Sequence, residues 1–297
     1  KPDFIKMNTR GIKGLQDWPQ PDDYALEQSR SLSGLILGEI DAHNGQIGFD
    51  RYMEMALYQP GLGYYSAGAR KFGIEGDFTT APETSRLFSI CLARQCEQVF
   101  DATGAATVLE LGAGTGAMAC DILTELRQRN ALPDRYLILE TSADLRQRQQ
   151  QLLQQHHADI INRLVWLDTL PEKPINGIIL ANEVLDALPV HRVIMKQGVV
   201  HELLVGYDNN SFGWRQSAGE FLPEQTQAIL NDYLPELPDG YVTEFNTILP
   251  PFIQSLSSTL GSGAIVLIDY GYPRREYYHP QRAAGTLVCH YRHRRHD

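Results

Sequence analysis

The sequence is poor in cysteine, and its four cysteines show no motif spacing. Cys91, Cys96, Cys120 and Cys289 form no C-x-x-C pair, so they predict neither a disulfide framework nor a zinc site. The histidine- and arginine-rich stretch at 289–296 fits no standard zinc pattern either, and the sequence predicts no bound metal. A reducing compartment is the simple expectation. Cys91 and Cys120 fall in apolar helical patterns, and we expect both to be buried.

Long apolar runs are also missing. No segment approaches the roughly 18–20 apolar residues that a membrane span needs, and no signal peptide is visible. We therefore expect a cytoplasmic bacterial protein, with a processed protein of the mitochondrial matrix as the alternative. The sequence stops within a polar, histidine- and arginine-rich loop, which is an unusual place for a domain to end.

Positive charge is in deficit. Lys and Arg number 26 against 36 Asp and Glu, so the net charge is −10. Broad nucleic-acid binding needs a basic surface, and this balance argues against it. An acidic surface instead favours the approach of a basic protein substrate. The length of 297 residues allows one large α/β domain with additions, or two modest domains.

The most informative segment is a glycine-rich turn between a predicted strand and a predicted helix. Residues 107–116 read Thr-Val-Leu-Glu-Leu-Gly-Ala-Gly-Thr-Gly, and a helical pattern of apolar residues follows at 117–126. This order is typical of the start of a Rossmann-like domain, where glycines let the backbone approach a ligand. Glu110 stands two residues before Gly112 and would repel phosphates. It favours a cationic ligand such as S-adenosylmethionine (SAM).

A dinucleotide remains an alternative for this turn. Gly112, Gly114 and Ala117 also fit the G-x-G-x-x-A variant of the dinucleotide fingerprint. That interpretation predicts an NAD-dependent oxidoreductase. Glu110 speaks against it, and no obvious histidine or tyrosine constellation for hydride transfer accompanies the turn. A tight turn with no ligand is the third alternative.

Predicted strands at 107–111, 136–140, 164–168, 177–183 and 264–269 alternate with predicted helices. This alternation predicts a Rossmann-like α/β fold with a doubly wound, mostly parallel sheet. Ligands bind at the carboxyl ends of such strands, where acids and an amide gather in this sequence: Glu110, Glu140, Asp168, Asn182, Glu183 and Asp269. Glu140 is placed to accept both ribose hydroxyls, and Asp168 could accept from an adenine amine. Solvated strand caps are the alternative.

The rest of the chain predicts additions to this sheet. We expect residues 1–104 to form an N-terminal extension and helical cap, which includes a covering loop at 71–88 and a helix at about 84–100. Residues 105–297 are predicted to form the SAM-binding domain, with an insertion at about 191–247. Within the insertion, Gln197-Gly198 joins two apolar runs and predicts a β-hairpin.

Five further blocks resemble the MidA family of class I methyltransferases, which includes the mitochondrial protein arginine methyltransferase needed for respiratory complex I assembly. The blocks are ALYQPGLGYY (56–65), KFGIEGDFTTAPETSRLF (71–88), ANEVLDALPV (181–190), DYGYP (269–273) and GTLVCHYRH (285–293). They are far more specific than the glycine turn. The sequence departs from the family at Ser89, where such proteins usually have glycine. The resemblance also implies that the sequence lacks a further helix and the last two strands of the sheet.

The resemblance implies a SAM-dependent methyltransferase that acts on an arginine of a protein partner, with a complex I subunit as a candidate. It implies S-adenosylhomocysteine as product, with a non-catalytic SAM-binding assembly factor as the alternative. Cofactor contacts are implied for Gly76, Asp77, Phe78, Thr79, Thr80, Glu110, Gly112, Ala113, Gly114, Gly116, Glu140, Asp168 and Asn182. Asn182, Glu183 and Asp186 would form the floor where the methyl group meets the acceptor. Asp186 could instead cap a helix that begins near Ala187.

Overall fold

The computed structural model describes residues 4–6, 20–66, 79–217 and 237–296. The chain divides into two compact units. One, here called the parallel unit, contains residues 70–187 and 250–270. The other, here called the antiparallel unit, contains residues 1–69, 188–249 and 271–297. Each unit is assembled from separate stretches of the chain, and each is described by itself.

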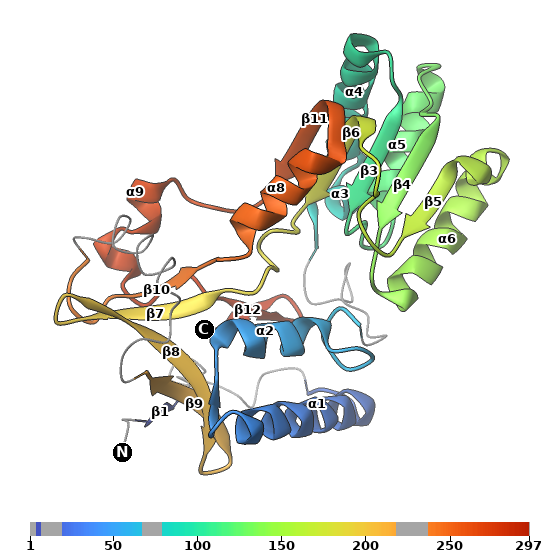
Figure 1. The fold of residues 1–297 in the computed structure, drawn as a ribbon. Coiled ribbons are helices and arrows are strands. Elements are labelled where there is room, and N and C mark those ends of the chain that lie inside the picture. Colours follow the sequence, from blue (N-terminus) through green and yellow to red (C-terminus); the bar gives the residue numbers. More distant parts are fainter. Residues whose placement is uncertain (1–3, 7–19, 67–78, 218–236, 297) are drawn as a thin grey trace. The chain divides into compact units, whose positions relative to one another are not determined.

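The parallel unit is built on a five-stranded sheet with the order β11-β6-β3-β4-β5. Every neighbouring pair in this sheet is parallel, as Figure 1 shows. The strands are β3 (Thr107–Leu111), β4 (Arg135–Leu139), β5 (Leu164–Leu167), β6 (Ile175–Asn182) and β11 (Leu260–Ile268). The predicted Rossmann-like α/β fold is therefore confirmed, and each strand lies within a few residues of its expected place.

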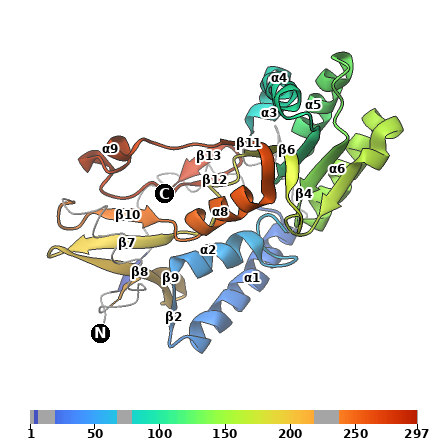
Figure 2. The same cartoon turned by 45° about the horizontal axis from the view of Figure 1, so that its top comes forward.

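Helices cover both faces of this sheet (Figures 1 and 2). They are α3 (Ala81–Thr84), α4 (Arg86–Thr103), α5 (Ala117–Gln128), α6 (Ala143–His157), the 3-10 turn η2 (Ala158–Arg163) and α8 (Leu249–Thr259). Apolar residues of α4, α5 and α6 pack with alternate strand residues in one core cluster. Leu256 and Phe252 of α8 pack with the other set in a second cluster. Alternation along each strand thus supplies two apolar faces, as a sheet covered on both sides requires.

Helix α5 shows the link from pattern to packing. Met118, Ile122 and Leu126 recur every four residues, and all three are buried against the sheet. Fully burying one such side chain contributes roughly 1.5–3 kcal/mol. The helix begins after Gly116, which has φ of 84°. The glycine turn and the start of this helix are therefore anchored by a buried stripe.

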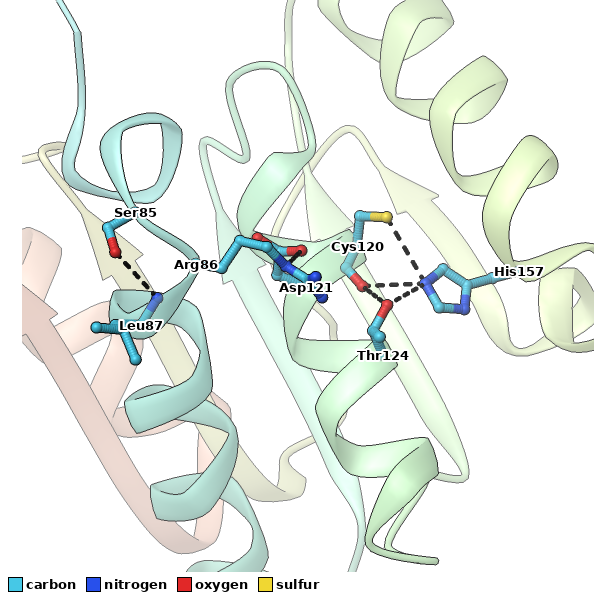
Figure 3. Close-up of polar contacts among 7 residues, drawn as sticks. All are labelled: Ser85, Arg86, Leu87, Cys120, Asp121, Thr124 and His157. Carbon is cyan, nitrogen blue, oxygen red and sulfur yellow. Dashed lines mark hydrogen bonds and ion pairs between the residues drawn. The ribbon is translucent and has the colours of Figure 1, made fainter.

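Polar contacts join α5 to its neighbouring helices (Figure 3). Nε2 of His157, at the end of α6, lies 3.0 Å from the carbonyl oxygen of Cys120, and Thr124 Oγ1 donates to the same oxygen over 2.8 Å. On the other side, Arg86 Nε donates to Asp121 Oδ1 at 2.8 Å. Burial lowers the pKa of His157, so its ring is neutral near pH 7. His157 therefore has a structural role, because its contacts hold the end of α6 against α5.

The phase of α4 differs from the sequence prediction. Cys91 was expected to be buried, but its side chain is exposed. The buried positions are instead Ser89, Leu92, Ala93, Cys96 and Phe100. Two helical stripes overlap in this sequence and share Leu92 and Cys96, and packing on the sheet selects the one that contains Ser89, Ala93 and Phe100. The same packing places α4 in the parallel unit, whereas the sequence prediction drew a boundary near residue 104.

Ser89 faces the core of the parallel unit with a hydroxyl that has no hydrogen-bond partner among the described residues. Because a buried unsatisfied hydroxyl is unfavourable, we expect Ser89→Ala to raise the free energy of unfolding by about 1 kcal/mol. Urea unfolding would measure this change. Ser89→Gly is the matched comparison. It also removes the hydroxyl, but glycine lowers helix stability by about 1 kcal/mol relative to alanine, so its free energy of unfolding should stay close to that of the native sequence. A destabilised Ser89→Ala protein would contradict the prediction.

The antiparallel unit contains a six-stranded sheet with the order β1-β9-β8-β7-β10, in which β2 pairs with β8. Its strands are β1 (Phe4–Lys6), β2 (Gln46–Ile47), β7 (His191–Lys196), β8 (Val199–Asp208), β9 (Ser211–Gln216) and β10 (Val242–Phe245). Strands β7 and β8 form the predicted hairpin. Gln197 and Gly198 both have positive φ at its turn, as type I′ hairpin turns require.

Two helices of this unit, α1 (Asp23–Ala42) and α2 (Phe49–Tyr58), pack on the sheet. The remaining elements are α9 (Arg274–Tyr277), the 3-10 turn η3 (Pro280–Arg282), β12 (Cys289–Tyr291) and β13 (Arg294–His296). Residues of the insertion and of the N-terminal segment therefore share one core. No helix among the described residues is long and apolar enough to cross a membrane.

Candidate cofactor and acceptor site

The carboxyl ends of the parallel strands lie along one edge of the sheet. Backbone hydrogen bonds continue the ladders past the strands: Gly112 N donates to Leu139 O at 3.0 Å and Glu183 N to Ile268 O at 2.8 Å. The chain runs outward from β3 to β4 and β5, then returns to β6 on the other side of β3. This reversal is the switch point where ligands bind in open α/β sheets.

The glycine turn at this edge needs its glycines. Gly112, Gly114 and Gly116 have φ of 60°, 54° and 84°, which side chains rarely adopt. A Cβ on Gly116 would lie 3.2 Å from Cγ of Gln149, and one on Gly112 would lie 3.2 Å from Cγ2 of Val184. The turn therefore presents bare backbone, as the sequence predicts for a turn that lies beneath a ligand.

Glu140 follows β4 and is tied to the glycine turn through Gln149. Its carboxylate accepts from Ser142 N at 2.9 Å and from Gln149 Nε2 at 3.0 Å. The same Nε2 donates to Gly114 O at 2.9 Å. Burial raises the pKa of Glu140, although these hydrogen bonds oppose the rise. The network fixes the predicted ribose acceptor beside the glycine turn.

Gln149 is a site residue that the sequence prediction missed. The glutamine-rich stretch 144–157 predicts a solvated helix, but the side chain of Gln149 is fully buried. Its Oε1 accepts from Trp166 Nε1 at 2.9 Å, so both ends of the amide are used. The only signal in the sequence is its position four residues before Leu153, on the inward face of α6.

Glu110 lies inside the core rather than on the surface of the turn. Its side chain is fully buried, and Tyr136 Oη donates to its Oε2. Burial raises the pKa of Glu110 to about 7, against the opposing effect of the Tyr136 hydrogen bond. Oε1 has no hydrogen-bond partner among the described residues. A buried carboxylate oxygen without a partner can accept a hydrogen bond from a ligand. The carboxylate of Glu110 therefore fits the expected ammonium group of SAM.

The raised pKa of Glu110 predicts a pH-dependent stability. Between about pH 4.5 and pH 7 the folded chain binds more protons than the unfolded chain, so stability falls as pH rises, by roughly 3 kcal/mol. We expect Glu110→Gln to remove this loss and to raise the free energy of unfolding at pH 8 but not at pH 4.5. Urea unfolding at both pH values measures it. The same change at exposed Glu172 should alter neither value; equal behaviour of the two variants would refute the prediction.

Asp168 follows β5 and is exposed. Its Oδ1 accepts from Arg146 Nη2 at 2.7 Å, and this nitrogen also donates to the carbonyl oxygens of Glu140 and Leu167. Arg146 therefore links the ends of β4 and β5. Because 85% of the Asp168 side chain is exposed, a contact from adenine to this carboxylate would compete with water.

On the other side of the switch point, Asp269 holds the segment that follows β6. Its Oδ2 accepts from Leu185 N at 2.7 Å and from Asp186 N at 3.1 Å, and its Oδ1 accepts from Tyr270 N at 2.8 Å. Residues 184–190 form turns rather than a helix. The alternative in which Asp186 caps a helix is therefore wrong, because backbone amides of this segment bind the Asp269 carboxylate instead.

Glu183 and Asp186 form an acidic pair on this segment. Burial raises the pKa of Glu183, and hydrogen bonds from Asn182, the Ala81 backbone and Tyr270 oppose that rise. Burial and the negative charges of Asp269 and Glu183 raise the pKa of Asp186 to about 6. Asp186 is exposed by surface area, so we expect solvent to screen part of this shift. Glu183 has φ of 53°, a strained conformation for a non-glycine residue.

The covering loop lies mostly outside the described residues, including Gly76, Asp77 and Phe78. Thr79 and Thr80 are described and precede α3, where Thr80 and Glu83 form a capping box. The contact between the Ala81 backbone and Glu183 brings the start of α3 to the end of β6. The described end of the loop thus reaches the acidic pair.

Together, the doubly wound parallel sheet, the glycine turn and the acid after β4 define a nucleoside-binding domain of the class I methyltransferase type. The family described as "Putative S-adenosyl-L-methionine-dependent methyltransferase" matches residues 91–297, more than half of the chain. The chain belongs to this family. The cofactor of this family is SAM, as its description states. The family match therefore favours SAM over the NAD-dependent alternative.

Named relatives agree with this assignment. The chain is 27% identical to the mitochondrial protein arginine methyltransferase NDUFAF7 of Danio rerio, over 77% of this chain and 59% of that protein. It is 25% identical to the mitochondrial NDUFAF7 homolog of Drosophila melanogaster, over 80% of this chain and 59% of that protein. The chain therefore spans 59% of the length of each of these relatives.

A solved structure shows the same fold with a bound product. A protein from Burkholderia thailandensis, crystallised with S-adenosylhomocysteine, is 42% identical to this chain and superimposes with a TM-score of 0.88. The match covers 94% of this chain and 72% of that chain. In this chain, the unpartnered Oε1 of Glu110 and the exposed backbone of the glycine turn are compatible with the same ligand, S-adenosylhomocysteine.

Proposed function

We propose that this protein transfers the methyl group of SAM to an arginine side chain of a protein. The observation that carries the proposal is the acidic pair, Glu183 and Asp186, at the strand end beside the glycine turn. Tyr270, which is 72% exposed, stands next to them. Two carboxylates and an aromatic ring are the groups that hold a planar guanidinium, through paired hydrogen bonds and cation–π contact. The arginine specificity in the names of the curated relatives supports the same acceptor.

Bound SAM supplies an electrophilic methyl group on a sulfonium, and transfer is a displacement in line with the breaking bond. The residues of this chain contribute orientation and exclusion of water. The Gly112–Gly116 turn and Glu140 would hold the cofactor. Glu183 and Asp186 would hold the guanidinium so that one nitrogen points at the methyl group.

Proton removal completes the reaction. A guanidinium is a poor nucleophile because it stays charged, and its reacting nitrogen must lose a proton as the new bond forms. The raised pKa of Glu183 makes its carboxylate a better proton acceptor than an ordinary surface glutamate. Asn182 Nδ2 lies 3.4 Å from Glu183 Oε1 and orients the carboxylate. Glu183 is therefore the proposed base, with Asn182 as its positioning residue.

The partner and the compartment are part of this proposal. The resemblance to the MidA family makes a respiratory complex I subunit the first acceptor to test. The higher identity to the Burkholderia protein favours the bacterial cytoplasm, while the names of the animal relatives favour the mitochondrial matrix. An arginine on a basic segment of the acceptor would suit the net charge of −10.

Methyl labelling tests the proposal. The chain is incubated with methyl-labelled SAM and a lysate of cells that lack the enzyme, and labelled residues are identified by mass spectrometry. The Burkholderia protein serves as a parallel sample. We expect label on arginine in one or a few proteins. Label on another residue type would overturn the acceptor. Absence of label in a chain that binds S-adenosylhomocysteine in calorimetry would favour a non-catalytic assembly factor.

A further inference from the structure

We propose that Asp50, His191 and Glu202 form a binding site for one Zn²⁺ ion in the antiparallel unit. Asp50 lies in the first turn of α2, His191 begins β7, and Glu202 lies on β8. This site is separate from the residues assigned to cofactor and acceptor, and the proposal does not depend on methyl transfer.

The three side chains converge on one point. His191 Nδ1 lies 2.8 Å from Glu202 Oε1 and 3.6 Å from Asp50 Oδ1. One ligand atom from each residue lies within 4.8 Å of the other two. Zinc bonds to imidazole nitrogen and carboxylate oxygen are about 2.0–2.2 Å, which places ligand atoms of a tetrahedral site roughly 3.3 Å apart. Small side-chain rotations would therefore bring all three atoms into ligand distance, with the fourth position left to water.

The other nitrogen of the His191 ring is already oriented. Nε2 lies 3.2 Å from Thr247 Oγ1. Histidines that bind metals usually donate their second N–H to an oxygen, which fixes the ring and directs the remaining nitrogen at the ion. Thr247 supplies such an oxygen, and it leaves Nδ1 facing the two carboxylates.

The charge of the cluster favours a divalent cation. Glu202 is 5% exposed and the His191 side chain is 15% exposed, and buried carboxylates are unfavourable without compensating charge. His191 Nδ1 lies between these two carboxylates, 2.8 Å from Glu202 Oε1 and 3.6 Å from Asp50 Oδ1. One Zn²⁺ ion bound through a neutral imidazole would balance the charge of both carboxylates.

The backbone beside the cluster leaves room for these ligands. A Cβ on Gly48, the N-cap of α2, would lie 2.2 Å from Asp50 Oδ1 and 3.8 Å from Glu202 Oε1. Any other residue at this position would displace the Asp50 carboxylate. A bound ion would join α2 to β7 and β8, elements far apart in the sequence, so its role would be structural.

Calorimetric titration of the metal-stripped chain with ZnCl2 tests the site. We expect one saturable equivalent in the native sequence. His191→Gln and Glu202→Gln should abolish it, and each should retain a native circular dichroism spectrum. The control is His201→Gln, on the same strand as Glu202, which should keep the equivalent. A triple variant, His290→Gln with His293→Gln and His296→Gln, should also keep it, which excludes binding by the terminal histidines. No saturable binding, or binding that survives His191→Gln, would overturn the proposal.

X-ray absorption of the zinc-loaded protein gives a second, independent readout. The expected first shell holds only nitrogen and oxygen. A sulfur ligand would place the ion at a cysteine instead, and would overturn the assignment. Zn²⁺ should also raise the thermal midpoint of the native chain and of His201→Gln, because an ion that binds only the folded state stabilises it. Absence of a shift in either protein would count against a site joining three elements.

Discussion

Glu183→Gln is expected to lower kcat for methyl transfer by about 10²–10⁴-fold, the usual contribution of a positioned general base. Glutamine keeps the shape of the side chain but cannot accept the proton of the guanidinium. Affinity for S-adenosylhomocysteine should stay within about twofold, because the proposed role of Glu183 is to contact the acceptor and not the cofactor. Radiometric turnover and calorimetry measure the two quantities. Unchanged turnover with intact cofactor binding would remove Glu183 from the mechanism.

The pH profile supplies a control for this prediction. Burial and the negative charges of Asp269 and Glu183 raise the pKa of Asp186 to about 6, and solvent screens part of this rise. Because the carboxylate must be ionised to hold a guanidinium, the rate should fall as pH decreases below about 6. In Asp186→Asn the limb that remains should be that of Glu183 alone, with a midpoint at lower pH because a neighbouring negative charge is gone, although the overall rate is lower. If the rate of the variant falls with the same midpoint as that of the native sequence, the titrating group is not Asp186.

Glu140→Ala is expected to weaken binding of S-adenosylhomocysteine by roughly 100-fold. Two hydrogen bonds from ribose to a charged acceptor contribute about 3 kcal/mol together, which corresponds to that factor. Asp168→Ala should weaken binding by about tenfold at most, because 85% of the Asp168 side chain is exposed and water competes for it. Calorimetry with purified product measures both variants. Equal losses would show that the two acids do not have the assigned roles.

A second comparison separates ribose binding from local packing. Glu140 also accepts hydrogen bonds from Ser142 N and Gln149 Nε2, so its removal disturbs the start of α6. Gln149→Met removes the network but leaves the Glu140 carboxylate. We expect a smaller loss of affinity for Gln149→Met than for Glu140→Ala. A loss as large in Gln149→Met would mean that Glu140 acts through the position of the glycine turn.

The sequence predicted the parallel sheet well because its signals are local. Each strand is a short apolar run of 4 to 9 residues that ends beside a polar residue or a glycine. The Gly112–Gly116 turn and the Gln197-Gly198 hairpin were found because positive φ restricts the residues that can stand there. The phase of α4 was predicted incorrectly at Cys91. Two overlapping apolar stripes fit that segment, and only contact with the sheet selects between them.

The candidate site was predicted in part. The positions of Glu140, Glu183 and Asp269 at strand ends were predictable from the sequence. The carboxyl ends of parallel strands lie at one edge of the sheet, independent of the connecting loops. The hydrogen bonds of Asp269 to the Leu185 and Asp186 amides were not predictable, since they join residues more than eighty positions apart. The burial of Gln149 was not predictable either. Its neighbours in the sequence are also glutamines, and its partners Gly114 and Trp166 lie on other elements.

The sequence by itself determined the class of fold and the edge at which the ligand site lies, because periodicity and glycine turns act over a few neighbouring residues. Tertiary structure alone decided the pKa values of the buried acids and the grouping of Asp50, His191 and Glu202. The pKa of Glu110 rises to about 7 because the core closes over it, and no local pattern encodes that burial. Asp50, His191 and Glu202 have no motif spacing, and they meet only because α2 packs on the hairpin of β7 and β8.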